Sequence, residues 1–153
     1  GVIMSLPIGL THLAWFGLGP HESYPDRLTG AAVGLYQQTV AEQYVPYVVP
    51  QEHGLHARTR WLTLSHDPKP ATRGQRSLKI DAHGMLHFSA SHFTPEDLTR
   101  ASHTPDLVRR DEVVLCLDAA HRGLGTKSCG PDTLDAYKVK PGRYRLRYAL
   151  TVL

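Results

Sequence analysis

The chain has 153 residues and a mass of 17.0 kDa, which suits a single domain with one hydrophobic core. Its formal net charge is +3, but the 17 basic and 14 acidic residues are interleaved, so we expect no nucleic-acid partner. The first ten residues, GVIMSLPIGL, have no basic signal-peptide region and are too short an apolar run to span a bilayer. We therefore expect no membrane association.

The chain does not begin with Met, and a strand-like segment starts within its first residues, so we expect a piece of a longer polypeptide. The two cysteines lie in different settings, Cys116 inside an apolar run and Cys129 in a polar one, and no CxxC motif is present. This pattern indicates free thiols in a reducing compartment, hence a cytoplasmic protein.

Hydrophobic patterning predicts mostly β-structure in the first half of the chain. Strands are expected at Val2 to Leu6 and Leu13 to Phe16, followed by a turn at Gly17 to Pro20, where two glycines and a proline occur. The segment Gly30 to Tyr44 is ambiguous, because its apolar residues could form a helical stripe while its glycine, threonine and valine favour a strand. We favour extended chain there.

Further strands are predicted in the middle of the chain. The segment Leu55 to Ser65 contains the strand-like run RWLTL. Residues Gln75 to Asp81 and Met85 to Phe93 read as two strands joined by a turn at Asp81 to Gly84, and the second alternates apolar and polar residues. A half-buried antiparallel hairpin is expected here.

Only one short helix has clear signals, over residues 95–102 and ending near His103. Thr94 is a suitable N-cap, Pro95 takes the first helical position, and two acidic residues follow in the first turn.

The C-terminal part predicts a buried strand at Val113 to Leu117 and a longer, alternating strand at Arg143 to Leu153. One face of the latter would carry three arginines, either as a basic stripe beside tyrosines or, as we favour, as a solvated outer face: Arg143, Arg145 and Arg147.

The loop between these strands, DAAHRGLGTKSCGPDTL at Asp118 to Leu134, is far longer than a connection requires. Loops above about 12 residues in compact domains are usually binding loops or disordered. Its glycines permit tight backbone and its proline stiffens the exit, so we favour an ordered binding loop over a surface crossover without a ligand.

Catalytic and metal motifs are weak or missing. His53 and His56 form the closest histidine pair, but without a helical HExxH motif or a nearby thiolate they read as surface histidines rather than metal ligands. No nucleophile elbow, P-loop or dinucleotide-binding glycine motif occurs.

Four carboxylates lie in or beside Gly/Pro-rich loops, where some could face a cleft: Glu22, Asp26, Glu52 and Asp118. The sequence does not pair them as the two carboxylates of a glycosidase. Alternatively, Glu22 and Asp26 brace loops through salt bridges with Arg27.

Four segments carry a resemblance to a known family: WFGLGPHESYPDRL at Trp15 to Leu28, YVPYVVPQEHGL at Tyr44 to Leu55, Arg60 to Leu62, and Leu115 to Leu134 with GLGTKSCGP. In this order and spacing they resemble the C-terminal, small-chain region (domain 5) of the large bacterial β-galactosidases of glycoside hydrolase family two. The resemblance covers nearly the whole chain.

The resemblance implies an all-β fold: residues 1–153 as the second half of an antiparallel β-supersandwich similar to galactose mutarotases. In that family the catalytic glutamates, the magnesium and most sodium ligands lie on a separate barrel, whose motifs are absent here. It therefore implies an accessory domain of a retaining enzyme that hydrolyses terminal β-D-galactosides such as lactose, with no catalytic or metal residue and no activity alone. Expected partners are the rest of the chain, a β-galactoside at the loop edge and, for the isolated domain, a second copy.

In the family, this loop reaches the mouth of the active site, where some members place a Trp against the leaving-group sugar. The matching position is Cys129, so Cys129, Ser128 and His121 are the expected substrate-binding residues. His56 departs from the Arg common after the family's GL pair. The alternative to an accessory domain is a free-standing, mutarotase-like carbohydrate-binding protein.

Overall fold

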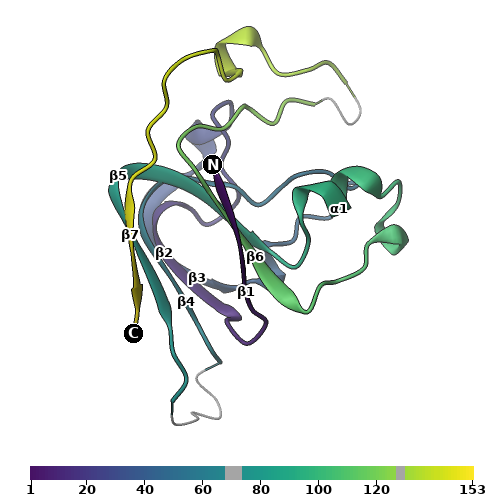
Figure 1. Cartoon of the computed structure of the whole chain (residues 1–153). Coiled ribbons are helices and arrows are strands. Elements are labelled where there is room, and N and C mark those ends of the chain that lie inside the picture. Colours follow the sequence, from purple (N-terminus) through teal and green to yellow (C-terminus); the bar gives the residue numbers. More distant parts are fainter. Residues whose placement is uncertain (68–73, 127–129) are drawn as a thin grey trace.

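The computed structural model describes residues 1–67, 74–126 and 130–153. Within these ranges seven strands form one antiparallel sheet in the order β1-β6-β5-β4-β2-β3, with β7 beside part of β5 (Figure 1). The strands are β1 (Val2–Pro7), β2 (His12–Gly19), β3 (Ala32–Thr39), β4 (His56–Ser65), β5 (Leu78–Ser91), β6 (Glu112–Asp118) and β7 (Tyr148–Val152). One α-helix, α1 (Pro95–Arg100), and four 3₁₀ turns complete the fold: Leu28–Gly30, Ala41–Gln43, Thr104–Asp106 and Asp135–Tyr137. The expected all-β, antiparallel class with one short helix is confirmed, as is the extended chain of β3.

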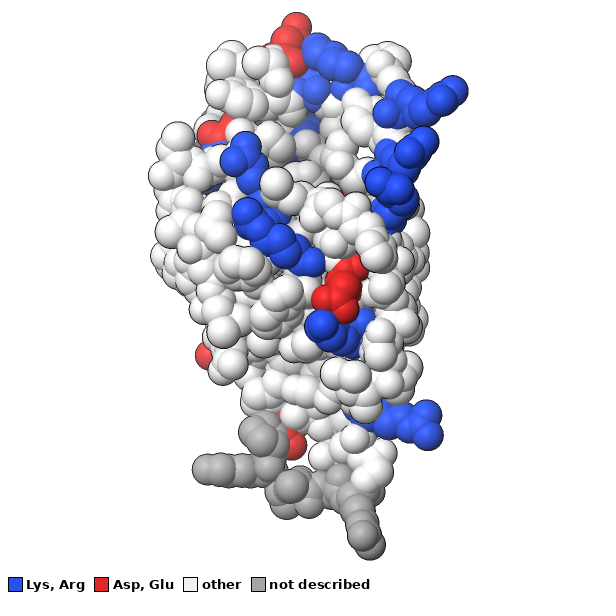
Figure 2. All heavy atoms as spheres, turned by 90° about the vertical axis from the view of Figure 1, so that its left-hand side faces the viewer, with Lys and Arg blue, Asp and Glu red and all other residues white. Residues whose placement is uncertain are grey.

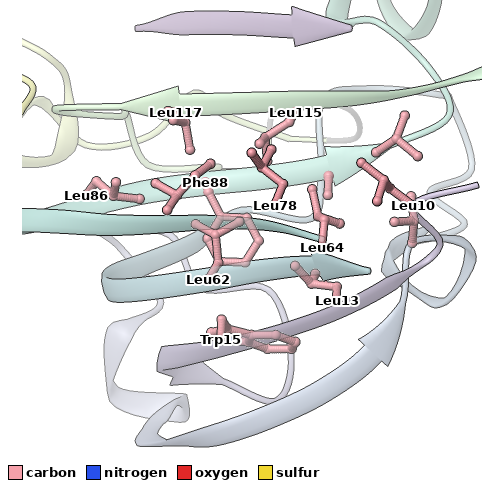
Figure 3. Packing of buried hydrophobic residues seen from close by; sticks show 14 residues of the cluster. Leu10, Leu13, Trp15, Leu62, Leu64, Leu78, Leu86, Phe88, Leu115 and Leu117 are labelled. Carbon is pink, nitrogen blue, oxygen red and sulfur yellow. The ribbon is translucent and has the colours of Figure 1, made fainter. Parts of the chain in front are cut away.

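The core lies on one face of the sheet, where alternate residues of the central strands are apolar (Figure 3). Trp15 is fully buried, and its ring lies 5.4 Å from that of Tyr36 and 6.0 Å from that of Phe88 between centroids. The buried cluster comprises Leu10, Leu13, Trp15, Val40, Leu62, Leu64, Leu78, Ile80, Leu86, Phe88, Ala90, Val113, Leu115 and Leu117. Because strands from both halves of the chain contribute, the cluster holds the sheet together.

The turn predicted at Gly17 to Pro20 is wrong, because β2 continues through Gly19. A Cβ on Gly17 would lie 2.8 Å from Thr59 Oγ1 and 3.0 Å from Thr59 Cα on the neighbouring strand. A Cβ on Gly19 would lie 2.7 Å from the ring of Tyr36. These glycines therefore permit close approach within the sheet rather than a change of direction.

The hairpin predicted at Asp81 to Gly84 is also wrong, because β5 is one continuous strand of 14 residues. Its neighbour β4 pairs with it on both sides of this region, with register shifts on either side of Thr59. Gly84 has a φ of 121°, and Arg58 in the irregular part of β4 has a φ of 54°. The sequence signal for a turn thus marks a bend inside a continuous strand.

Helix α1 begins as predicted, since the Thr94 side chain accepts a hydrogen bond from Asp97 N and Asp97 caps Thr94 N in return. It ends at Arg100, before the predicted boundary near His103. The carboxylate of Asp106 accepts hydrogen bonds from Ser102 N and His103 N, which fixes that segment in a non-helical turn. None of the helices in the described ranges has the length and apolar character to cross a membrane.

The C-terminal strand is shorter than the predicted residues 143–153. Along one edge of β5, residues Leu78 to Ala82 pair with β7, and residues from His87 onward pair with β6. The three arginines of the predicted stripe therefore precede the strand, and all are exposed: Arg143, Arg145 and Arg147. Figure 2 views this side of the molecule and shows Lys and Arg gathered over its upper part, with few acidic side chains among them.

Candidate functional site

The long loop leaves the sheet at Asp118, where β6 ends, and its base is fixed by one carboxylate from a distant segment (Figure 1). Asp26 Oδ1 accepts a hydrogen bond from Leu124 N at 3.0 Å, and its Oδ2 accepts one from Gly125 N at 2.9 Å. Thr133 Oγ1, on the returning arm of the loop, donates to Oδ2 at 3.1 Å. Although burial acts to raise the pKa of Asp26, the backbone hydrogen bonds from Gly125 and Leu124 hold it below its ordinary value.

Further contacts close the two arms of the loop on each other. Arg122 forms an ion pair with Asp132, and Thr126 donates through both N and Oγ1 to the carbonyl of Pro131. Gly125 has a φ of 67°, and a Cβ there would lie 2.6 Å from Thr133 N. The described parts of the loop are therefore held as an ordered structure, as predicted.

A second carboxylate, Glu22, fixes the segment opposite the loop. It forms an ion pair with Arg27 at 2.8 Å, accepts a hydrogen bond from the Tyr47 hydroxyl, and accepts another from Gly54 N at 3.0 Å. Burial and the bond to Glu22 raise the pKa of Tyr47 to about 12. The predicted Glu22 to Arg27 salt bridge is thus confirmed, whereas Asp26 does not join it and binds loop amides instead.

A third carboxylate, Glu52, faces the loop. The hydroxyl of buried Tyr24 donates to its two oxygens, at 3.0 and 2.9 Å, and His121 Nε2 lies 3.6 Å from Oε1. The Tyr24 and His121 rings meet edge to face with centroids 5.5 Å apart. Burial raises the pKa of Glu52 above its ordinary value, while His121 and the Tyr24 hydroxyl act in the opposite direction.

Two pockets adjoin along the loop and share Val49 and Leu124 in their walls. The first has a volume of about 420 Å³, with Glu52 and His121 among its lining residues. The second, of about 580 Å³, extends toward Asp26 and the exposed Val48. Both volumes fall within the range of about 300 to 1,000 Å³ typical of small-molecule sites.

The histidines of the predicted pair are not surface residues. His53 is 6% exposed, with Nδ1 2.9 Å from the Gln51 carbonyl oxygen, and His56 is 1% exposed. His56 stacks on Phe88 with centroids 5.1 Å apart, and its Nε2 lies 2.5 Å from Gln43 Oε1. Burial lowers the pKa of His56 to about 4. Across residues 1–67, 74–126 and 130–153, no three His, Cys, Asp or Glu side chains are grouped so that they could hold a metal ion.

Of the three predicted substrate-binding residues, His121 lines the first pocket. Ser128 and Cys129 lie outside the described residues, so their role stays a prediction. Cys116 is an unpaired cysteine in β6, as predicted. Sequence reasoning did not find Tyr24 or the loop-binding role of Asp26, although both lie in a segment that carried the family resemblance.

Comparison with known proteins supports that resemblance. The family described as "Beta galactosidase small chain" matches residues 1–151. The chain belongs to this family. It is 40% identical over 125 residues to a β-galactosidase of Vibrio cholerae, covering 82% of this chain and 11% of that protein. It is 39% identical over 142 residues to a β-galactosidase of an Arthrobacter species, covering 92% of this chain and 14% of that protein.

A β-galactosidase of Vibrio vulnificus is 34% identical over 154 residues, covering 97% of this chain and 14% of that protein. The 153 residues thus span only 11 to 14% of the length of these three relatives. The small-chain domain described here is one part of such proteins.

Proposed function

We propose that these residues form the C-terminal accessory domain of a retaining β-galactosidase, whose catalytic groups lie elsewhere in the polypeptide. The observation that carries the proposal is the ordered base of the long loop. Asp26 binds the loop at Leu124 and Gly125 on its outgoing arm and at Thr133 on its returning arm, so these two points of the loop are held together at one carboxylate. Family membership supports a role for this loop at the mouth of the active site.

In this proposal His121, Ser128 and Cys129 contact the carbohydrate, and the chemistry of glycosidic cleavage belongs to the barrel. Magnesium and sodium are expected on that barrel, and no step assigned to the domain depends on them. A cytoplasmic location is also part of the proposal, and the unpaired thiol of Cys116 supports it. The mutarotase-like alternative is less favoured, because the three relatives are β-galactosidases of much greater length.

The proposal is tested by comparing the full-length polypeptide with residues 1–153 alone in hydrolysis of o-nitrophenyl β-galactoside. We expect turnover by the former and none by the latter above a heat-killed control, because the paired carboxylates of a glycosidase are supplied by the barrel. Activity of the domain alone would overturn the accessory role.

A second measurement addresses the loop. Replacing Cys129 by Trp in the full-length enzyme should strengthen glucose binding as an acceptor by roughly 5 to 30-fold, since an aromatic ring adds about 1 to 2 kcal/mol of contact. If neither Cys129→Trp nor Cys129→Ala changes the acceptor constant, the loop does not contact the leaving-group sugar.

A further inference from the structure

The contact between Glu52 and His121 depends on where one hydrogen lies. His121 Nδ1 is 2.9 Å from the carbonyl oxygen of Arg122, and a carbonyl oxygen only accepts, so Nδ1 carries a hydrogen. In a neutral imidazole the other nitrogen, Nε2, then has a lone pair and no hydrogen. Nε2 faces Glu52 Oε1 across 3.6 Å. With a neutral imidazole and an ionised carboxylate, two groups that only accept would therefore face each other.

One bound proton removes this conflict. On His121 it makes Nε2 a donor and creates an ion pair with the carboxylate, and on Glu52 it makes the acid a donor to the lone pair of Nε2. The Tyr24 hydroxyl does not supply this hydrogen, because it donates to Glu52 itself. Burial raises the pKa of Glu52, which favours retention of a proton in the pair. The contact therefore joins the loop to Glu52 only while the pair holds a proton.

Solvent reaches the pair, so this proton can exchange. The accessible fraction of the side chain is 21% for His121 and 33% for Glu52. Other titratable or charged side chains of the described segments face the pair or line its pocket: Glu22, His53, His87, Cys116 and Arg122. The negative charge of Glu22 favours the protonated pair. Arg122 acts in the opposite direction, but its charge is paired with Asp132.

We propose that the long loop is held by a proton-dependent contact, in which Glu52 and His121 share one proton whose release at higher pH frees the loop between Asp118 and Gly123. The released proton passes to solvent, and the lone pair of Nε2 then faces the carboxylate. The proposal concerns how the loop is held and does not depend on what the loop binds.

The other anchor of the loop responds to pH in the opposite direction. Asp26 binds Leu124 N and Gly125 N as an ionised carboxylate, and its lowered pKa keeps this contact intact above about pH 4. The contact between Glu52 and His121 is instead present at low pH and lost as the pH rises. Both anchors act together only between these limits, so release on the alkaline side should be confined to residues before Leu124.

The test is hydrogen exchange resolved to single amides in the full-length polypeptide, from about pH 5.5 to about pH 8.5, which includes the ordinary pKa of imidazole near 6.5. Gly123 N, which donates to the Tyr137 carbonyl at 2.8 Å, reports on the freed segment. Leu124 N and Gly125 N report on the Asp26 anchor. After correction for the intrinsic pH dependence of exchange, we expect the protection of Gly123 to fall about 5 to 20-fold as the pH rises. The protection of Leu124 and Gly125 should change less than about twofold.

Two variants separate the proton from the packing. Glu52→Gln turns an amide hydrogen toward neutral His121 while its oxygen still accepts from Tyr24, so protection of Gly123 should stay high and independent of pH. His121→Phe keeps a ring beside Tyr24 but removes both nitrogens, so protection should be low at every pH. Glu96→Gln, which changes an exposed acid in the first turn of α1, is the matched control and should follow the wild-type protein.

Protection of Gly123 that does not change with pH in the wild-type polypeptide would overturn the proposal. A pH-dependent loss in Glu52→Gln as large as that of the wild-type protein would also overturn it, because the titrating group would then lie elsewhere. If Glu52→Gln fails to fold, His121→Phe decides, since a pH-dependent loss that survives in this variant contradicts a proton shared with His121.

Discussion

The carboxylate of Asp26 lies 2.9 Å from the amide nitrogen of Gly125, a residue 99 positions later in the chain. Gly125 has a φ of 67°, so this amide is presented by a backbone conformation that few other residues adopt readily. Their contact ties the long loop, which leaves the sheet at Asp118, to the segment that follows β2. A carboxylate is well suited to this, because it accepts from several backbone N–H groups at once without offering a competing donor.

Asp26→Asn should therefore destabilise the fold by about 1 to 3 kcal/mol, because an amide NH₂ would face a backbone N–H where an oxygen now accepts. The loss should be visible in chemical denaturation at neutral pH. Thr133→Val, which removes only the hydroxyl donor, should cost less, about 0.5 to 1.5 kcal/mol. Asp111→Asn changes an exposed acid and is the control. Equal stability of Asp26→Asn and Asp111→Asn would show that the carboxylate does not hold the loop.

The same contact has a defined pH dependence. Because the pKa of Asp26 is lowered in the folded state, its contribution is present above the unfolded value near 4 and disappears as the pH falls through the folded pKa. The stability difference between the wild-type protein and Asp26→Asn should consequently shrink as the pH falls below about 4. A difference that stays constant as the pH is lowered would contradict the ionised form as the loop anchor.

His56 predicts a loss of stability in a higher pH range. Its pKa is lowered from 6.5 to about 4 by burial, so the unfolded chain binds a proton that the folded protein excludes. The contribution of neutral His56 to stability is fully present above pH 6.5 and is lost as the pH decreases toward 4. Over this whole interval the free energy of unfolding should fall by roughly 3 kcal/mol. Between pH 7 and 4.5 the denaturation midpoint of His56→Phe should depend less on pH than that of the wild-type protein. This variant retains an aromatic ring against Trp15 and Phe88. His103→Gln, at a 79% exposed side chain, should follow the wild-type curve.

Gly17 tests whether close packing, rather than a turn, explains the glycines of β2. Gly17→Ala would place a methyl group 2.8 Å from Thr59 Oγ1 and 3.0 Å from Thr59 Cα, so β2 and β4 must separate. We expect a loss of about 1 to 3 kcal/mol. Gly30→Ala has nothing within 4 Å of its new methyl group and should be neutral or slightly stabilising. Denaturant midpoints that are the same for the two variants would argue against the packing explanation.

The strands with regular alternation could be predicted from the sequence, because burial of one sheet face imposes a period of two. The glycines of β2 and Gly84 misled the prediction, since a glycine marks either a turn or a close backbone approach and the sequence does not distinguish them. The difference depends on Thr59 and Tyr36, which lie on other strands.

The candidate site shows the same limit. Asp26 and Glu52 were recognisable as acids in loops, but their partners, Gly125 and His121, are supplied by a loop far along the chain. Local spacing contains no information on such pairs, because the topology of the sheet brings them together. The family resemblance directed attention to this loop for a reason independent of these contacts, and its functional role stays a prediction.

The strands at the two ends of the strand order lead to the last prediction, which concerns association of residues 1–153 on their own. Strands β1 and β3 end the strand order, and each carries exposed apolar side chains, with Ile3 58% and Leu35 61% exposed. Unpaired edge backbone flanked by apolar side chains favours pairing with a second copy. Light scattering should therefore show self-association, most simply as a two-fold dimer, that increases with concentration.

Ile3→Lys or Leu35→Lys should shift the species toward 17.0 kDa, because a lysine on an edge strand opposes pairing. Met85→Lys places the same charge at a 61% exposed position in the bend of β5, away from either edge, and should leave association unchanged. A monodisperse 17.0 kDa species in the wild-type domain at the highest concentrations would show that its exposed edges are tolerated without a partner.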